Sequence, residues 1–159
     1  MMLFNVCIYI LTYWTTVSAT DCPDLWTPYH GSCYHFDHTH YSFMDAEQYC
    51  NQHNGRLVQF ETKEEIAFVK NFISYEKETS WWIGLTDGDV EGQWLWYRTD
   101  AAPEVTDWST GEPNNYGNGE DCVEYRQVNG HWGWNDVPCG PVRASAICEI
   151  VLSEGGIVG

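Results

Sequence analysis

Apolar residues recur at the spacing of an amphipathic α-helix in two stretches of the first half of the chain. In the first stretch, Ser42 and Asp45 have the spacing of a capping box, and Gly55 follows as a stop signal. The apolar face between them consists of Phe43, Ala46, Tyr49 and Cys50. This pattern predicts a helix over about residues 43–53.

The second helical stretch begins at Thr62, which has the spacing of a capping box with Glu65. The apolar positions that follow at helical spacing are Ile66, Val69, Phe72 and Ile73. A helix is therefore predicted over about residues 63–74.

Strand-like patterns rich in aromatic residues occupy most of the remaining chain. Pro28 and Gly31 mark turns in a predicted hairpin over residues 22–34. Further strands are predicted at 81–85, 93–97, 121–125, 132–134 and 146–150, with turns at Asn129-Gly130 and at 138–141. Helices combined with small antiparallel sheets indicate an α+β fold.

The stretch from residue 99 to about 121 has little periodicity and contains five Gly or Pro residues: Pro103, Gly111, Pro113, Gly117 and Gly119. Loops longer than about 12–15 residues are uncommon in compact domains and are usually functional or disordered. Trp108, Tyr116 and Cys122 anchor this loop, which argues against simple disorder. Something beyond the local sequence must therefore order it.

A chain of 159 residues is long enough for one domain of common size and too short for two well-buried ones. Residues 1–19 contain no charged side chain and end in Val17-Ser18-Ala19, a small-residue cleavage signal. We expect a signal peptide over 1–19, a secreted protein, and a single domain over 20–159 with its core at about 22–150. The apolar run is too short to span a bilayer, so no membrane insertion is expected.

The cysteine count agrees with an extracellular setting. Of seven cysteines, Cys7 lies in the expected signal peptide, which leaves six for three disulfides. Six cysteines allow about fifteen pairings, so spacing alone does not fix the connectivity. A zinc site is the competing interpretation, but the sequence contains no CxxC pair.

The formal net charge of −16 excludes some classes of partner. Phosphate backbones and anionic membranes are bound by Lys and Arg, and this chain has only seven of them. We therefore expect no nucleic-acid partner. Most of the 23 acidic residues belong to an ordinary solvated surface, but several cluster in the second half of the chain.

Hard-oxygen side chains are concentrated in and after the long loop: Glu112, Asn114, Asn115, Glu120, Asp121, Asn135 and Asp136. Sets of oxygen ligands select calcium or magnesium over zinc, and calcium accepts more ligands in less regular geometry. An Asn- and Gly-rich loop therefore suits calcium. The alternative is that these are the polar residues found in any turn.

Five motifs in order resemble the C-type lectin domain family: Trp82-Ile83-Gly84-Leu85, Glu112-Pro113-Asn114, Glu120-Asp121-Cys122, Trp134-Asn135-Asp136 and the terminal Cys148. The resemblance covers about residues 22–150. It implies a C-type lectin-like fold, in which two helices and small sheets carry a long calcium-ordered loop. It also implies disulfides Cys22–Cys33, Cys50–Cys148 and Cys122–Cys139.

The resemblance assigns the expected calcium ligands by position. A principal ion would be held by Glu112, Asn114, Glu120, Asn135 and Asp136. A second, auxiliary ion would be held by Asp87, Glu91, Asn115 and Asp121 and shared with Glu120. A cis Glu112-Pro113 bond would turn both flanking side chains toward one ion, whereas trans is the ordinary state of a loop proline.

The resemblance also implies a sugar preference. Glu112, Asn114, Glu120 and Asn135 would contact the sugar, and the order Glu-Pro-Asn goes with equatorial 3- and 4-hydroxyls, as in mannose. A galactose profile through aromatic stacking is the competing hypothesis, with Trp108, Tyr116, Trp132 and Trp134 as candidate stacking residues. Core packing is the ordinary role of each Trp.

Two other classes of function compete with this interpretation. A glycoside hydrolase could use Glu112 and Glu120 as paired carboxylates, but no nucleophile motif is present, and calcium would prevent both from holding a proton. A C-type-lectin-like module that binds protein, ice or mineral usually lacks some calcium ligands, whereas all five are present here. We therefore expect a lectin and no enzyme activity.

Two remaining features complete the prediction. The tract of His35, His38 and His40 superficially resembles a metal site, but surface histidines before a helix are the simpler interpretation. A single sugar site of this kind binds at about millimolar affinity, so mannose-type glycans on cell or microbial surfaces would be bound through several sites. Homo-oligomerisation through domain surfaces would provide them, in a role such as innate recognition.

Overall fold

Both predicted helices are present in the computed structural model, which describes residues 22–152. Helix α1 spans Phe43–Gln52 and α2 spans Lys63–Ile73. The side chains of Ser42 and Thr62 accept hydrogen bonds from the backbone N–H groups of Asp45 and Glu65, as the capping boxes predict.

The strands pair into one connected sheet network rather than several small sheets. Their bounds are β1 Thr27–Tyr29, β2 Ser32–Tyr41, β3 Arg56–Leu57, β4 Ser80–Thr86, β5 Leu95–Trp96, β6 Cys122–Val128, β7 His131–Val137 and β8 Ala144–Val151. The main path runs β1-β2-β8-β4-β6-β7, with β3 on β8 and β5 on β4. All pairs are antiparallel except β4 with β8. The α+β class is confirmed.

Two strand predictions were wrong in extent. The strand expected at 93–97 is reduced to β5, which pairs with β4 for two residues. A turn closed by the N–H of Gln93 on the carbonyl of Val90 precedes it, and the N–H groups of Thr99 and Asp100 turn back to the carbonyl of Trp96 and end it. The hairpin expected to end at residue 34 continues in β2 to Tyr41. The three histidines at positions 35, 38 and 40 therefore lie in this strand, and His38 and His40 are exposed.

The core consists of aromatic and aliphatic side chains from both helices and the central strands. Trp81, Trp82, Trp96 and Trp134 are among the largest fully buried side chains. The three disulfides are those that the resemblance implied: Cys22–Cys33, Cys50–Cys148 and Cys122–Cys139. Cys50 and Cys148 are completely buried, so their bond joins α1 to β8 inside the core.

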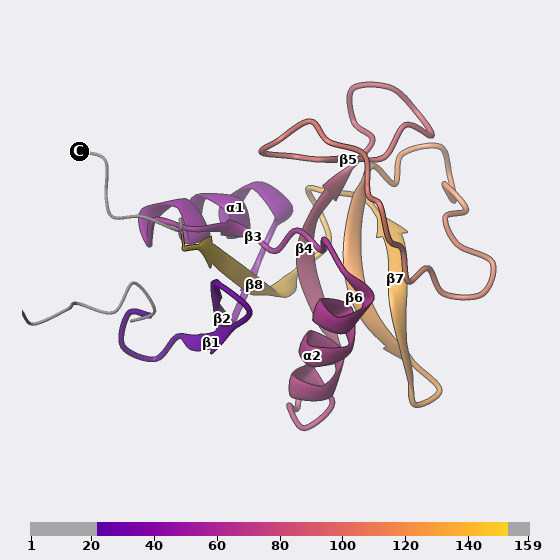
Figure 1. Cartoon of the computed structure of the whole chain (residues 1–159). Coiled ribbons are helices and arrows are strands. Elements are labelled where there is room, and N and C mark those ends of the chain that lie inside the picture. The colour runs from indigo at the N-terminus through magenta and orange to yellow at the C-terminus, as the bar shows by residue number, and fades with distance from the viewer. Residues whose placement is uncertain (1–21, 153–159) are drawn as a thin grey trace, which may run out of the picture.

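The fold brings the loops around β5 to one end of the molecule (Figure 1). The loop after β4 and the connection after β5 lie at the top of the view, and the long chain to β6 runs from there down the right side beside β7 and back, whereas the β6–β7 turn lies at the bottom. That turn is the predicted Asn129-Gly130, and both residues have positive φ, as a two-residue hairpin requires. Between Cys22 and Leu152 no helix is long and apolar enough to cross a membrane. The expected signal peptide at 1–19 lies outside the described residues.

Candidate functional site

The long loop is held against strand β7 by one buried carboxylate. Asp136, which is 1% exposed, accepts hydrogen bonds from the backbone N–H of Asn114 at 3.0 and 3.1 Å and from that of Asn115 at 2.6 Å. Asn115 adopts a positive φ of 45°. Backbone N–H groups at a turn are anchored here by an acid from a rigid strand, so Asp136 fixes the loop conformation.

Glu112 and Asn114 flank Pro113, and the Glu112-Pro113 bond is cis. The Nδ2 of Asn114 donates to Oε2 of Glu112 at 2.5 Å. Asn114 is exposed and Glu112 is half-buried, so the pair faces solvent at the tip of the loop. The Glu112 carboxylate and the Asn114 amide thus lie side by side at the surface.

Glu120 closes the other side of the loop. Its Oε2 accepts the backbone N–H of Tyr116 at 2.7 Å, and its own N–H donates to Oδ1 of Asn115 at 3.2 Å. Residues 112 to 120 therefore form a loop whose polar groups turn toward one another and toward Asp136.

A second group of predicted ligands adjoins the first through Asn115. Its Nδ2 donates to Oε2 of Glu91 at 2.5 Å. Asp87 lies at the end of β4, where its Oδ2 accepts the N–H of Gly92 at 2.7 Å. The hydroxyl of Thr86 donates to the carbonyl oxygen of Asp121 at 2.6 Å, which brings the start of β6 to the same place.

Asn135 is the predicted ligand that the structure does not join to the loop. Its Nδ2 donates instead to Oε1 of Glu124 at 3.1 Å, across the β6–β7 pairing. This contact uses one amide hydrogen, and an amide nitrogen has two.

Glu124 was not foreseen from the sequence. It is buried and also accepts hydrogen bonds from Ser80 and, at 3.1 Å, from Arg126. It therefore positions Asn135. The sequence signal for this role was an acid between the apolar residues Val123 and Tyr125, followed by an arginine two residues later.

The carboxylates of this region have no cationic partner among the ion pairs of residues 22–152. None of those pairs involves Glu112, Glu120, Asp136, Asp87, Glu91 or Asp121. Burial, followed by the adjacent carboxyl of Asp136, raises the pKa of Glu112 to about 7. Burial and then neighbouring acids also raise the pKa values of Asp87 and Glu91.

Within residues 22–152, one buried carboxylate oxygen has no hydrogen-bond partner. Oδ1 of Asp87, which is 3% exposed, makes no hydrogen bond, although buried polar atoms are normally satisfied. An unpaired carboxylate oxygen beside other acids and amide oxygens is the donor set of a hard cation such as calcium. The residues present therefore fit the metal that the sequence predicts.

The aromatic candidates for sugar stacking differ in solvent exposure. Trp134 is completely buried, and Trp108 and Trp132 are partly buried against the same core. The backbone of Trp108 forms a parallel bridge with Trp134, a short pairing inside the long loop that the sequence did not predict. Only Tyr116, at 83% exposed, presents its ring to solvent beside the loop.

Comparison with known proteins gives a consistent result. A family model described as the lectin C-type domain matches residues 39–150. Echinoidin of Heliocidaris crassispina is 32% identical over 148 residues, covering 84% of this chain and 99% of its own. C-type lectin domain family 4 member E of Mus musculus is 38% identical over 120 residues, covering 74% of this chain, which spans 55% of that relative's length.

A solved structure supports the same grouping. The carbohydrate-recognition domain of cow CD23, determined in the presence of a GlcNAc2Man3 oligosaccharide, superposes with a TM-score of 0.74 at 30% identity. The match covers 84% of this chain and 98% of the CD23 chain. The likeness therefore extends over nearly all of the described residues.

Proposed function

The chain belongs to the C-type lectin domain family, and from this we propose that it is a calcium-dependent lectin whose sugar site is centred on Glu112-Pro113-Asn114. Family members are carbohydrate-binding proteins and not enzymes. The observation that carries the proposal is the convergence of unneutralised carboxylates at one end of the fold, with Oδ1 of Asp87 buried and unpaired.

The proposed ligands form two adjoining sets. The principal calcium would be held by Glu112, Asn114, Glu120, Asn135 and Asp136. The auxiliary calcium would be held by Asp87, Glu91, Asn115 and Asp121, with Glu120 shared. Support for a shared arrangement comes from Asn115, whose backbone N–H is bound by Asp136 and whose side chain contacts Glu91.

Sugar selection would follow from the polarity of the groups that flank the proline. Calcium, when bound, would accept lone pairs from two adjacent sugar hydroxyls. The Glu112 carboxylate can only accept a hydrogen bond, whereas the Asn114 amide can also donate one. Their order along the loop defines which hydroxyl donates and which accepts, and we propose that it favours the equatorial 3- and 4-hydroxyls of mannose-type sugars.

Affinity chromatography tests this proposal. The refolded domain, with its disulfides intact, should be retained on immobilised mannose in calcium buffer and released by EDTA. Addition of calcium alone should restore retention. A domain that binds mannose equally well in EDTA would contradict calcium dependence, and one that binds a protein ligand but no sugar would favour the non-sugar members of this fold.

The sugar preference has its own prediction. The double variant Glu112→Gln, Asn114→Asp reverses the donor and acceptor positions, so the ratio of mannose to galactose affinity should change by about tenfold or more toward galactose, or about 1.4 kcal/mol. Competition with free sugars measures the ratio. The matched control is Glu104→Gln, Asn71→Asp, at two exposed positions outside the loop of residues 112 to 120. An unchanged ratio in the first variant would remove the specificity argument.

A pH dependence is expected from the raised pKa of Glu112. Below about pH 7 the metal-free protein holds a proton on this group, which calcium must displace, so calcium affinity should fall by about tenfold per pH unit at most. Because the folded pKa exceeds the ordinary value of 4.5, the contribution of Glu112 to metal-free stability is full below that value and is lost as the pH rises to about 7. The calcium-induced rise in Tm should therefore grow from pH 5 to pH 8. A constant rise would contradict this prediction.

We propose an extracellular setting and multivalent glycan targets. Support comes from the three disulfides, which persist in oxidising compartments. A single exposed site would bind a monosaccharide at about millimolar affinity, so mannose-type glycans on cell or microbial surfaces would be captured through several copies of the domain.

A further inference from the structure

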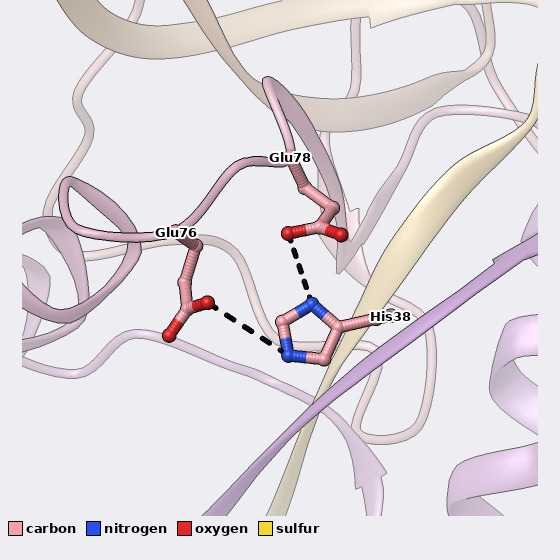
Figure 2. A group of neighbouring side chains, drawn as sticks. All are labelled: His38, Glu76 and Glu78. Atoms are coloured by element: carbon pink, nitrogen blue, oxygen red, sulfur yellow. Dashed lines mark ion pairs between the residues drawn. The ribbon is translucent and has the colours of Figure 1, made fainter.

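A histidine and two glutamates meet far from the lectin loop (Figure 2). Nδ1 of His38 lies 2.9 Å from Oε2 of Glu78, and Nε2 of His38 lies 3.9 Å from Oε2 of Glu76. One nitrogen or oxygen from each of the three residues lies within 4.8 Å of the others. Figure 2 shows the imidazole of β2 pointing between two carboxylates that come from the segment after α2.

The three residues come from two short segments of the chain, one of which carries a second histidine. His38 and His40 stand two residues apart in β2, and Glu76 and Glu78 stand two apart in the α2–β4 connection. The register of β2 with β8 shifts between Asp37 and Tyr41, and such irregularities redirect side chains from the regular pleat.

An ordinary ion pair does not fully account for this group. One imidazole faces two carboxylates, and across the structure's described range neither glutamate has a lysine or arginine partner. The His38 ring packs edge-on against the buried Trp81, with centroids 5.4 Å apart, which orients it. The side chain is nevertheless 50% exposed, so an ion can reach it from solvent.

We propose that His38, Glu76 and Glu78 bind a divalent transition-metal ion of the zinc type. Imidazole nitrogen combined with carboxylate oxygen suits zinc and its neighbours, whereas calcium prefers oxygen alone. Zinc bonds of about 2.0–2.2 Å require the ligands to approach more closely than they do here, and solvent-accessible glutamates can rotate to do so. The ion would link β2 to the α2–β4 segment.

The site is separate from the proposed calcium loop. Glu78 precedes β4 and Asp87 follows it, and a strand of seven residues is about 20 Å long. In Figure 1 the segment after α2 lies at the opposite end of β4 from the loops around β5. Zinc binding and sugar binding can therefore fail independently.

Calorimetric titration of the intact domain with zinc chloride, in saturating calcium, tests the proposal. One ion should bind, and His38→Ala and the double variant Glu76→Gln, Glu78→Gln should each weaken binding at least about tenfold, since loss of even an outer partner typically costs 10–100-fold. The matched control is His131→Ala, an exposed histidine at the start of β7 that makes no described ion pair. Binding that is absent, or that is unchanged in His38→Ala, would overturn the proposal.

Nuclear magnetic resonance of the unsubstituted protein provides a test that does not depend on the folding of a variant. Zinc should shift the ring nitrogen resonances of His38, while the signals of His53 and His131 stay unchanged. Shifts confined to other histidines would assign the zinc to a different place and overturn the proposal.

Discussion

Replacing Asp136 with alanine is expected to weaken calcium-dependent glycan binding by at least about 100-fold. The substitution removes a proposed metal ligand and leaves the backbone N–H groups of Asn114 and Asn115 without their acceptor. An unsatisfied buried donor costs about 1–3 kcal/mol, so two of them cost about 2–6 kcal/mol. Together with the loss of a metal ligand, this reaches the roughly 2.7 kcal/mol that corresponds to 100-fold. Binding to a mannose surface, measured against calcium concentration, gives the effect directly.

The fold should survive this substitution, because Asp136 contacts a loop and the core beneath it is apolar. The far-ultraviolet circular dichroism of Asp136→Ala should match the unsubstituted protein, while the calcium-induced rise in Tm disappears. Asp24→Ala, at an exposed turn near the N-terminal disulfide, is the matched control and should retain both. If Asp136→Ala kept wild-type affinity, the loop would not be organised as we describe.

The double variant Cys50→Ala, Cys148→Ala is expected to lose about 4–5 kcal/mol of unfolding free energy. The bond closes a loop of 98 residues, and the chain-entropy estimate for such a loop is about 4.7 kcal/mol. Single domains of this size have unfolding free energies of only about 5–15 kcal/mol, so the variant should lose a large part of its stability. Urea unfolding followed by tryptophan fluorescence measures the change.

The Cys22–Cys33 bond provides the comparison, because it closes only 11 residues and its estimate is about 2.8 kcal/mol. Cys22→Ala, Cys33→Ala should therefore unfold at a higher urea concentration than the core variant. The reverse order would indicate that loop length does not govern these contributions and that packing around the sulfur atoms does.

Local signals in the sequence were sufficient for the elements that are locally determined. Ser42 and Thr62 cap their helices, and Asn129-Gly130 forms the two-residue turn, because these preferences depend on neighbours along the chain. The extension of β2 to Tyr41 was missed, because its partner β8 lies more than one hundred residues away and its own residues are polar. The length of β2 is therefore set by its pairing with a strand that is distant in the sequence.

The candidate site also contains features that the sequence predicted and features that it did not. The family motifs named the residues that meet around Asp136, including Asn114 and Asn115. They did not predict that Asn135 would be held by Glu124, or that Asp87 would keep a buried oxygen unpaired. Those features arise from strand register and burial, which no local pattern records.

The most direct test of the account is a glycan array probed with the labelled domain in calcium and again after EDTA treatment. We predict binding to mannose-type glycans that disappears in EDTA and returns when calcium is restored. Binding that persists in EDTA, or an array without any glycan signal in calcium, would contradict the claim that the loop around Glu112-Pro113-Asn114 is a calcium-dependent sugar site.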